Sequence, residues 1–131
     1  MQWHALLWVG IGGFLGANAR YILSSWIATR FPPVLGKAMP LGTAFVNITG
    51  SFLLALFLAY IDRRLNMPDS VKLLVGTGFF GAYTTFSTYA NEGFALLNSK
   101  DWLVGLIYIF GTNILCLLGV MLGLFIANRL F

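Results

Sequence analysis

Charged residues divide this chain into four long apolar stretches. The stretches cover residues 6–27, 41–61, 71–97 and 102–127. Each is long enough to cross a bilayer as an α-helix, because about 20 residues at a rise of about 1.5 Å per residue span the ~30 Å hydrocarbon core. The pattern therefore predicts an all-α membrane protein in which residues 1–131 form a single domain of four transmembrane helices.

The third apolar stretch contains the residues that are least suited to a continuous helix. Residues 76–92 combine Gly76, Gly78 and Gly81 with a run of threonine and serine, and these residue types propagate an α-helix poorly. Thr84 lies at the midpoint of 71–97, so we expect the third helix to be broken near the bilayer centre. Because an unpaired backbone group is costly in lipid, protein should enclose such a break, or water and ions should reach it.

Polar side chains recur at helical spacing in the second and fourth stretches. The positions are spaced i, i+4, i+8 in each case: Thr43, Asn47 and Ser51 in the second stretch, and Tyr108, Thr112 and Cys116 in the fourth. Residues at this spacing share one face of a helix, so the two stripes should face the protein interior. Polar residues within a membrane either join helices or contact a substrate. Both interpretations stay open for Asn47, whereas helix packing is favoured for Cys116.

Small residues and two charges mark the first and third stretches. Gly12 and Gly16 place a small face on the first helix, where another helix can approach closely. Arg20 continues that face, and it either extends to the lipid headgroups or faces a watery cavity. Glu92 follows the weak part of the third stretch. A carboxylate within the membrane needs a partner or an aqueous vestibule, and Arg20 is a candidate partner.

The composition excludes several classes of protein. Hydrophobic residues make up 59% of the chain and charged residues only 9%, which is outside the range of a soluble domain. One histidine, His4, and one cysteine provide no metal-ligand cluster, and no pair of acids is placed for acid–base chemistry. We therefore expect neither an enzyme nor a nucleic-acid-binding protein.

The charges that flank the stretches are nearly balanced between the two sides of a four-span protein. Arg63, Arg64, Lys72 and Arg129 would lie on one side, and Arg30, Lys37 and Lys100 on the other. With four cations on one side and three on the other, the positive-inside rule does not predict a single orientation for the chain. We infer that the chain inserts in both orientations, which would permit an antiparallel dimer.

The chemistry of the stretches suits a small ion that has lost its water. Hydroxyl and amide donors can replace the hydration shell of an anion, and the edge of a phenyl ring carries positive charge that can face it. Carbonyl groups freed by a helix break have the opposite polarity and suit a cation. The same short segment could therefore hold a cation while anions pass beside it.

Three motifs carry a resemblance to a known family. They are Gly16-Ala17-x-x-Arg20-Tyr21, Gly42-Thr43-x-x-Val46-Asn47-x-x-Gly50 and Gly78-x-x-Gly81-x-x-Thr84-Thr85-Phe86-Ser87-Thr88. In this order, and over essentially its whole length, the chain resembles the Fluc, or CrcB-type, fluoride channel family. The third motif is specific, whereas the first two would be weak alone.

The resemblance implies a fold, a function and a bound ion. It implies a dual-topology homodimer of antiparallel subunits in the bacterial inner membrane, with two pores that export fluoride passively from the cytoplasm. It also implies a sodium ion at the two-fold axis of the dimer. In the family this ion is held by main-chain carbonyls that match Gly81 and Thr84 of each subunit.

The resemblance also implies roles for individual residues. The pore phenylalanine matches Phe86 and the pore-lining asparagine matches Asn47. The polar track maps onto Ser87, Thr88, Tyr108 and Thr112, with Thr43 nearby, and the vestibule positions match Arg20 and Glu92. Tyr89 stands where the family usually has a second phenylalanine; its ring edge is retained, so we expect conduction to survive. Cys116 stands where a small polar residue is more typical.

Two other functions are compatible with four small spans. A proton-coupled exporter would need a titratable carboxylate near the bilayer centre, and Glu92 lies off-centre on the broken helix. A membrane scaffold without transport would explain the glycine faces but not the polar stripes. The composition favours the channel over both.

Overall fold

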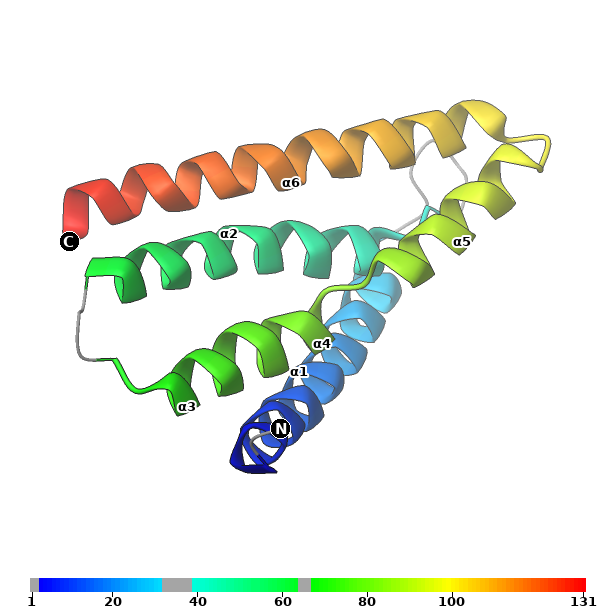
Figure 1. Cartoon of the computed structure of the whole chain (residues 1–131). Coiled ribbons are helices and arrows are strands. Elements are labelled where there is room, and N and C mark those ends of the chain that lie inside the picture. Colours follow the sequence, from blue (N-terminus) through cyan, green and yellow to red (C-terminus); the bar gives the residue numbers. More distant parts are fainter. Residues whose placement is uncertain (1–2, 32–38, 64–66) are drawn as a thin grey trace.

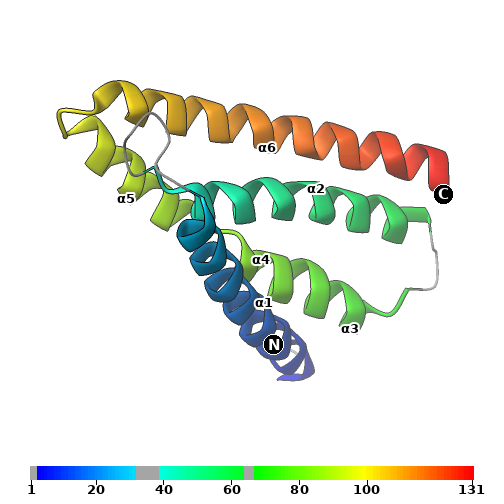
Figure 2. The ribbon, with the colours of Figure 1, turned by 180° about the vertical axis from the view of Figure 1, so that it is seen from behind.

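The computed structural model describes residues 3–31, 39–63 and 67–131. All regular elements in these ranges are helices, in the order α1 (Trp3–Arg30), α2 (Leu41–Arg63), α3 (Asp69–Val71), η1 (Lys72–Phe80), α4 (Gly81–Tyr83), α5 (Phe86–Leu97) and α6 (Trp102–Leu130). Helices α2 and α6 lie side by side and run in the same direction (Figure 1). The segment from α3 to α4 runs in the opposite direction, and α1 packs against η1 and α2 (Figure 2).

In the part of the chain that the structure describes, three helices are long and apolar enough to cross a membrane, namely α1, α2 and α6. The third apolar stretch is instead folded as consecutive shorter helices from Asp69 to Leu97, with η1 wound as a π-helix. The all-α prediction is therefore confirmed, and the protein is a multi-pass membrane protein.

The predicted break in the third stretch is present, and it is short. Thr84 has an extended backbone with ψ of 158°, and Thr85 follows with φ of −150° and ψ of 117°. Helix α5 then begins at Phe86. The glycines of this stretch do not themselves interrupt the helix, because Gly76 and Gly78 lie within η1 and Gly81 begins α4.

Close helix packing explains Gly78 and the glycines of α1 that face it. A Cβ atom at Gly12 would lie 1.9 Å from the carbonyl oxygen of Leu74, and one at Gly16 would lie 2.1 Å from that of Phe79. On the opposing helix, a Cβ at Gly78 would lie 2.8 Å from the Val9 carbonyl oxygen. The predicted small face of α1 is thus confirmed, and it brings α1 and η1 into backbone contact.

The fourth stretch uses glycine in the same way. A Cβ atom at Gly123 would lie 2.6 Å from the carbonyl oxygen of Phe52, and one at Gly119 would lie 3.2 Å from that of Ile48. These two glycines therefore serve helix packing. Helix α6 therefore lies directly along α2, and side chains from both can face a common space.

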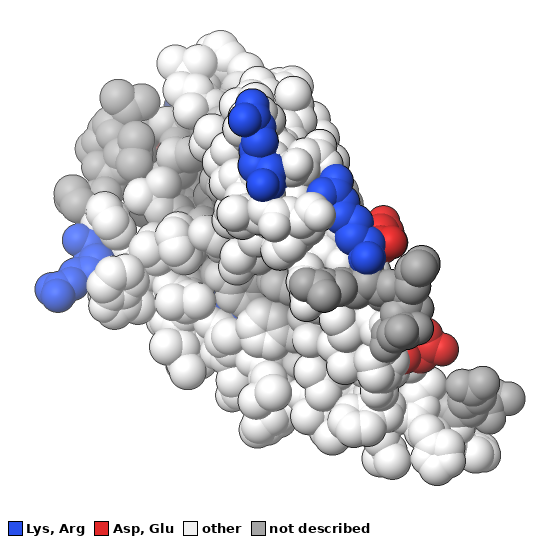
Figure 3. Space-filling view, turned by 90° about the vertical axis from the view of Figure 1, so that its left-hand side faces the viewer, with Lys and Arg blue, Asp and Glu red and all other residues white. Residues whose placement is uncertain are grey.

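One end of the molecule is fixed by an arginine. Arg63 donates to the Ala127 carbonyl oxygen at 3.0 Å and to Asn128 Oδ1, which joins the ends of α2 and α6. Lys72 and Arg129 belong to this end, and Figure 3 shows scattered basic and acidic side chains on its otherwise uncharged surface. Arg30 and Lys100 belong to the opposite end. Arg64 and Lys37 lie outside the described residues, so the charge balance between the two ends stays a prediction.

Candidate functional site

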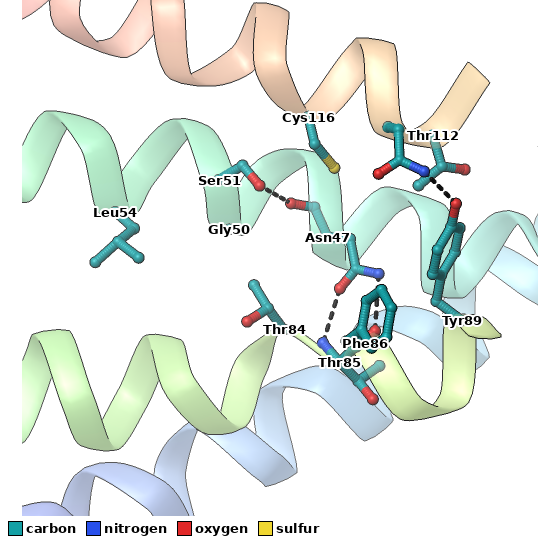
Figure 4. Close-up of a pocket in the computed structure, with 11 residues that line it drawn as sticks. Asn47, Gly50, Ser51, Leu54, Thr84, Thr85, Phe86, Tyr89, Thr112 and Cys116 are labelled. Carbon is teal, nitrogen blue, oxygen red and sulfur yellow. Dashed lines mark hydrogen bonds between the residues drawn. The ribbon is translucent and has the colours of Figure 1, made fainter. Parts of the chain in front are cut away.

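The broken backbone between α4 and α5 is bound by a side chain of α2. Asn47 Oδ1 accepts the Thr85 N–H at 2.8 Å, and Asn47 Nδ2 donates to the Thr85 carbonyl oxygen at 3.0 Å (Figure 4). Without Asn47 the Thr85 N–H would be unpaired within the membrane, whereas the Thr85 carbonyl, at the N-cap of α5, would keep its bond within that helix. Asn47 therefore makes the helix break possible, and it does so at the edge of a cavity.

Threonine side chains complete the two helix ends that meet at the break. The Thr85 hydroxyl oxygen accepts the Thr88 N–H at 3.3 Å and caps the N-terminus of α5. The N–H and the hydroxyl of Thr84 both donate to the Phe80 carbonyl oxygen, at 3.1 and 2.9 Å. Because the Thr85 N–H bonds to Asn47, it does not bond to the Gly81 carbonyl as it would in a continuous helix. The break thus leaves carbonyl oxygens of α4 without helical partners.

A cavity of about 240 Å³ opens beside the break, between α2 and α6 (Figure 4). It is lined by hydroxyl, amide, thiol and ring groups from four parts of the chain: Asn47, Gly50, Ser51, Leu54, Thr84, Thr85, Phe86, Tyr89, Thr112, Asn113 and Cys116. The polar stripes of the second and fourth stretches therefore meet here, as their spacing predicts. The structure brings five predicted site residues together at this cavity: Asn47, Thr84, Phe86, Tyr89 and Thr112.

Two aromatic rings of α5 contribute to the wall of this cavity. The centroids of the Phe86 and Tyr89 rings lie 6.0 Å apart with the rings tilted by 49°. Phe86 is 78% exposed on this chain, whereas Tyr89 is only 6% exposed and also packs against Tyr108. The Tyr89 ring is thus held in place by its surroundings, whereas the Phe86 ring is not.

Three other predicted residues form a separate cluster. Thr43 donates from its hydroxyl to Glu92 Oε1 at 2.9 Å, and the Tyr108 hydroxyl donates to Glu92 Oε2 at 2.7 Å. The candidate pairing of Glu92 with Arg20 was wrong, because no ion pair joins these two described residues. Hydroxyl groups from α2 and α6 reach both carboxylate oxygens instead.

Arg20 lies in a second cavity, of about 200 Å³. Its lining residues come from α1, α2 and the start of α5: Ala17, Arg20, Tyr21, Ser24, Thr43, Val46, Thr85 and Thr88. Arg20 is ten residues, or about 15 Å of helix, from the end of α1 at Arg30. The cavity interpretation of Arg20 is therefore favoured over contact with the headgroups. Thr85 lines both cavities, so the break lies between them.

The other predicted site residues are distributed around the break. Thr88 lines the second cavity, whereas Ser87 lines neither cavity and is exposed on this chain. Gly81 is exposed, and a Cβ there would meet nothing within 4 Å.

Sequence reasoning favoured helix packing for Cys116 and gave Asn113 only as a further close-contact position of the fourth stretch. Cys116 lies four residues after Thr112, and that spacing was a signal that it could share the cavity. Asn113 lies beside the stripe rather than on it, so periodicity gave no signal. Its position at the cavity depends on a contact with Tyr89 that only the fold brings about.

Comparisons with known proteins agree on one family. A family described as "CrcB-like protein, Camphor Resistance (CrcB)" matches residues 7–124. A relative from Koribacter versatilis, named fluoride-specific ion channel FluC, is 44% identical over 88% of each chain. Another from Moorella thermoacetica, named fluoride-specific ion channel FluC 2, is 45% identical over 97% of this chain and 99% of its own. A third, from Hydrogenobaculum sp., also named fluoride-specific ion channel FluC, is 41% identical over 92% and 94%. This chain belongs to the CrcB family.

Proposed function

We propose that this protein is a fluoride-selective channel through which fluoride leaves the cytoplasm passively. The observation that carries the proposal is the cavity at the helix break, in which hydroxyl groups, two amides and two aromatic rings converge. The relatives named fluoride-specific ion channels support the choice of ion. A channel needs no reaction chemistry, in keeping with a family of transport proteins rather than enzymes.

The cavity offers donors and ring edges that can replace the water around a small anion. Among the described residues no hydrogen bond uses the Thr112 hydroxyl, although Thr112 is only 4% exposed and lines the cavity. This hydroxyl is therefore available to donate to an anion. The edges of the Phe86 and Tyr89 rings carry positive charge and can face the same ion. Conduction requires that these groups bind fluoride weakly enough for it to leave again.

The proton-coupled exporter is not favoured by the surroundings of Glu92. Such a transporter needs a carboxylate that meets its substrate, whereas both Glu92 oxygens accept hydrogen bonds from hydroxyl groups of α2 and α6. Glu92 is also absent from the lining of the cavity at the break.

Four spans and an antiparallel homodimer belong to the same proposal. The two halves of the third stretch, on either side of Thr84 and Thr85, would together cross the bilayer beside α1, α2 and α6. Phe86 is 78% exposed beside the cavity, and a second copy would enclose it. A tag at the C-terminus should then be accessible from both sides of the membrane in equal amounts. Finding it on the cytoplasmic side only would contradict the dual topology.

A structural sodium ion at the dimer axis is compatible with the residues of the break. The Gly81 carbonyl lacks its helical donor because Asn47 takes the Thr85 N–H, and Gly81 itself is exposed on this chain. Main-chain carbonyls of Gly81 and Thr84 from two chains would hold the ion, which would neutralise their partial negative charge. The purified dimer should retain sodium after dialysis into a potassium buffer, and its complete loss would contradict an enclosed site.

Liposomes that contain the purified protein should release fluoride and retain chloride. The expected selectivity follows from the small cavity and its few donors, since a larger halide gains less from contacts of fixed geometry. A fluoride electrode and a chloride electrode outside the same liposomes would measure both ions. Equal release of the two ions, or release of neither, would contradict the proposed function, and dependence on a proton gradient would favour the exporter.

A further inference from the structure

Tyr89 differs from the usual phenylalanine by a hydroxyl group, and the structure shows where that group lies. The hydroxyl donates to the Ile109 carbonyl oxygen of α6 at 2.8 Å. It is turned toward α6 (Figure 4), where the side-chain amide of Asn113 contacts it. The proton that the extra hydroxyl could offer to an anion is therefore already committed to the protein.

Asn113 closes this arrangement from the side of α6. Its Nδ2 atom donates both to the Tyr89 hydroxyl oxygen and to the Ile109 carbonyl oxygen, the latter at 2.8 Å. Three polar groups thus form one closed set of hydrogen bonds between α5 and α6. A side chain held by a hydrogen bond at its tip and by packing along its ring has little freedom to rotate.

We propose that Asn113 is a positioning residue that fixes the Tyr89 ring edge at the cavity and keeps the Tyr89 hydroxyl away from the permeating ion. The inference rests on the proposed channel function and deepens it. The ring lies between Phe86, 6.0 Å away, and Tyr108, 5.3 Å away, and it is 6% exposed. Asn113 lines the same cavity, so removing its amide changes what holds the ring without removing any ring.

The proposal separates the effects of the two residues. Without Asn113, the Tyr89 hydroxyl keeps the Ile109 carbonyl as a partner but loses the donor beside it. Its proton can then turn from that carbonyl toward an anion in the space that the amide leaves, which would bind the anion and slow its passage. Without the hydroxyl, as in Tyr89→Phe, no such donor exists and the ring stays between its aromatic neighbours. We therefore expect Asn113 to matter only while residue 89 is tyrosine.

Fluoride efflux from liposomes tests this dependence in a double-mutant cycle. Asn113→Ala should lower the efflux rate about fivefold, the factor that one ordinary hydrogen bond contributes to an equilibrium. In the Tyr89→Phe background the same substitution should change the rate less than about twofold. Equal losses in the two backgrounds would overturn the proposal. If Asn113→Ala does not fold, Asn113→Ser replaces it, because the serine hydroxyl is too short to reach Tyr89.

A second measurement reports on the ring whether or not the protein conducts fluoride. The protein is labelled with 3-fluorotyrosine, and the ¹⁹F resonance of residue 89 is assigned by its loss in Tyr89→Phe. Asn113→Ala should shift or broaden this resonance, and an unchanged resonance would overturn the proposal. Absence of fluoride flux from the unmodified protein would instead overturn the proposed function.

Asn18→Ala is the matched control for both measurements. Asn18 also donates from Nδ2 to the carbonyl oxygen four residues earlier, that of Phe14 at 2.7 Å, and its side chain lies on an exposed part of α1. It should leave the Tyr89 resonance unchanged. A resonance that responds equally to both substitutions would show that Asn113 has no special part in holding the ring.

Discussion

Phe86→Ile should reduce fluoride efflux from reconstituted liposomes to the leak of protein-free liposomes. Isoleucine keeps apolar bulk at this position but removes the ring edge that can face an anion. The fold should survive, because Phe86 is 78% exposed on this chain and its only ring partner among the described residues is Tyr89. Efflux measured with a fluoride electrode, together with size-exclusion chromatography of the same sample, tests both parts.

Phe94→Ile provides the matched control for this loss of flux. Phe94 lies on the same helix, α5, and is 69% exposed, but it lines neither of the two cavities at the break. We expect its replacement to leave efflux within about twofold of the unmodified protein, as is usual for an exposed side chain without a specific role. Unchanged flux in Phe86→Ile would remove Phe86 from the mechanism.

Asn47→Ala should have the largest effect on stability of the substitutions considered. It would remove the two bonds of 2.8 and 3.0 Å that Asn47 makes to Thr85, and it would leave the Thr85 N–H unpaired. One buried polar group left unpaired costs about 1–3 kcal/mol, and the lost bond to the Thr85 carbonyl adds about 1 kcal/mol, so we expect the free energy of unfolding to fall by about 2–4 kcal/mol. Unfolding in detergent, followed by circular dichroism, measures the change.

Ser51→Ala is the comparison that isolates the contribution of the break. Ser51 lies one turn further along α2 at the same cavity, but its hydroxyl donates to the Asn47 carbonyl oxygen of its own helix, at 2.7 Å, and not to the break. Loss of such a local bond should change stability by less than about 1 kcal/mol. If both substitutions destabilise the protein equally, the bonds to Thr85 contribute nothing beyond those of an ordinary polar side chain.

The position of the break could be predicted from the sequence because it depends on local composition. A run of threonines at the midpoint of an apolar stretch weakens the helix there whatever surrounds it, and Thr84 is where the helix ends. The glycines before it were harder to interpret. Gly78 lowers helix propensity equally well whether it breaks a helix or lets α1 approach, and only the facing helix decides between these outcomes.

The contacts of the polar side chains could be predicted only in part. Spacing alone placed Asn47 on an inward face, and it brought Thr112 to the same cavity. The partner of each group depends on how helices from distant parts of the chain are turned. For that reason Glu92 accepts hydrogen bonds from two hydroxyl groups instead of pairing with Arg20. The spacing of polar residues likewise gave no indication of the bond between Asn113 and Tyr89.

The hydrogen bonds of Arg63 to the end of α6 have a consequence for biosynthesis. Its guanidinium charge is already shared with the last carbonyls of a neighbouring helix, where the helix dipole is negative. In the folded protein, a cation bound in this way is less available to the lipid headgroups than a free lysine would be. If the chain inserts in both orientations, as proposed, the two outcomes differ little in free energy, and one added lysine at either end should commit every newly made copy to a single direction.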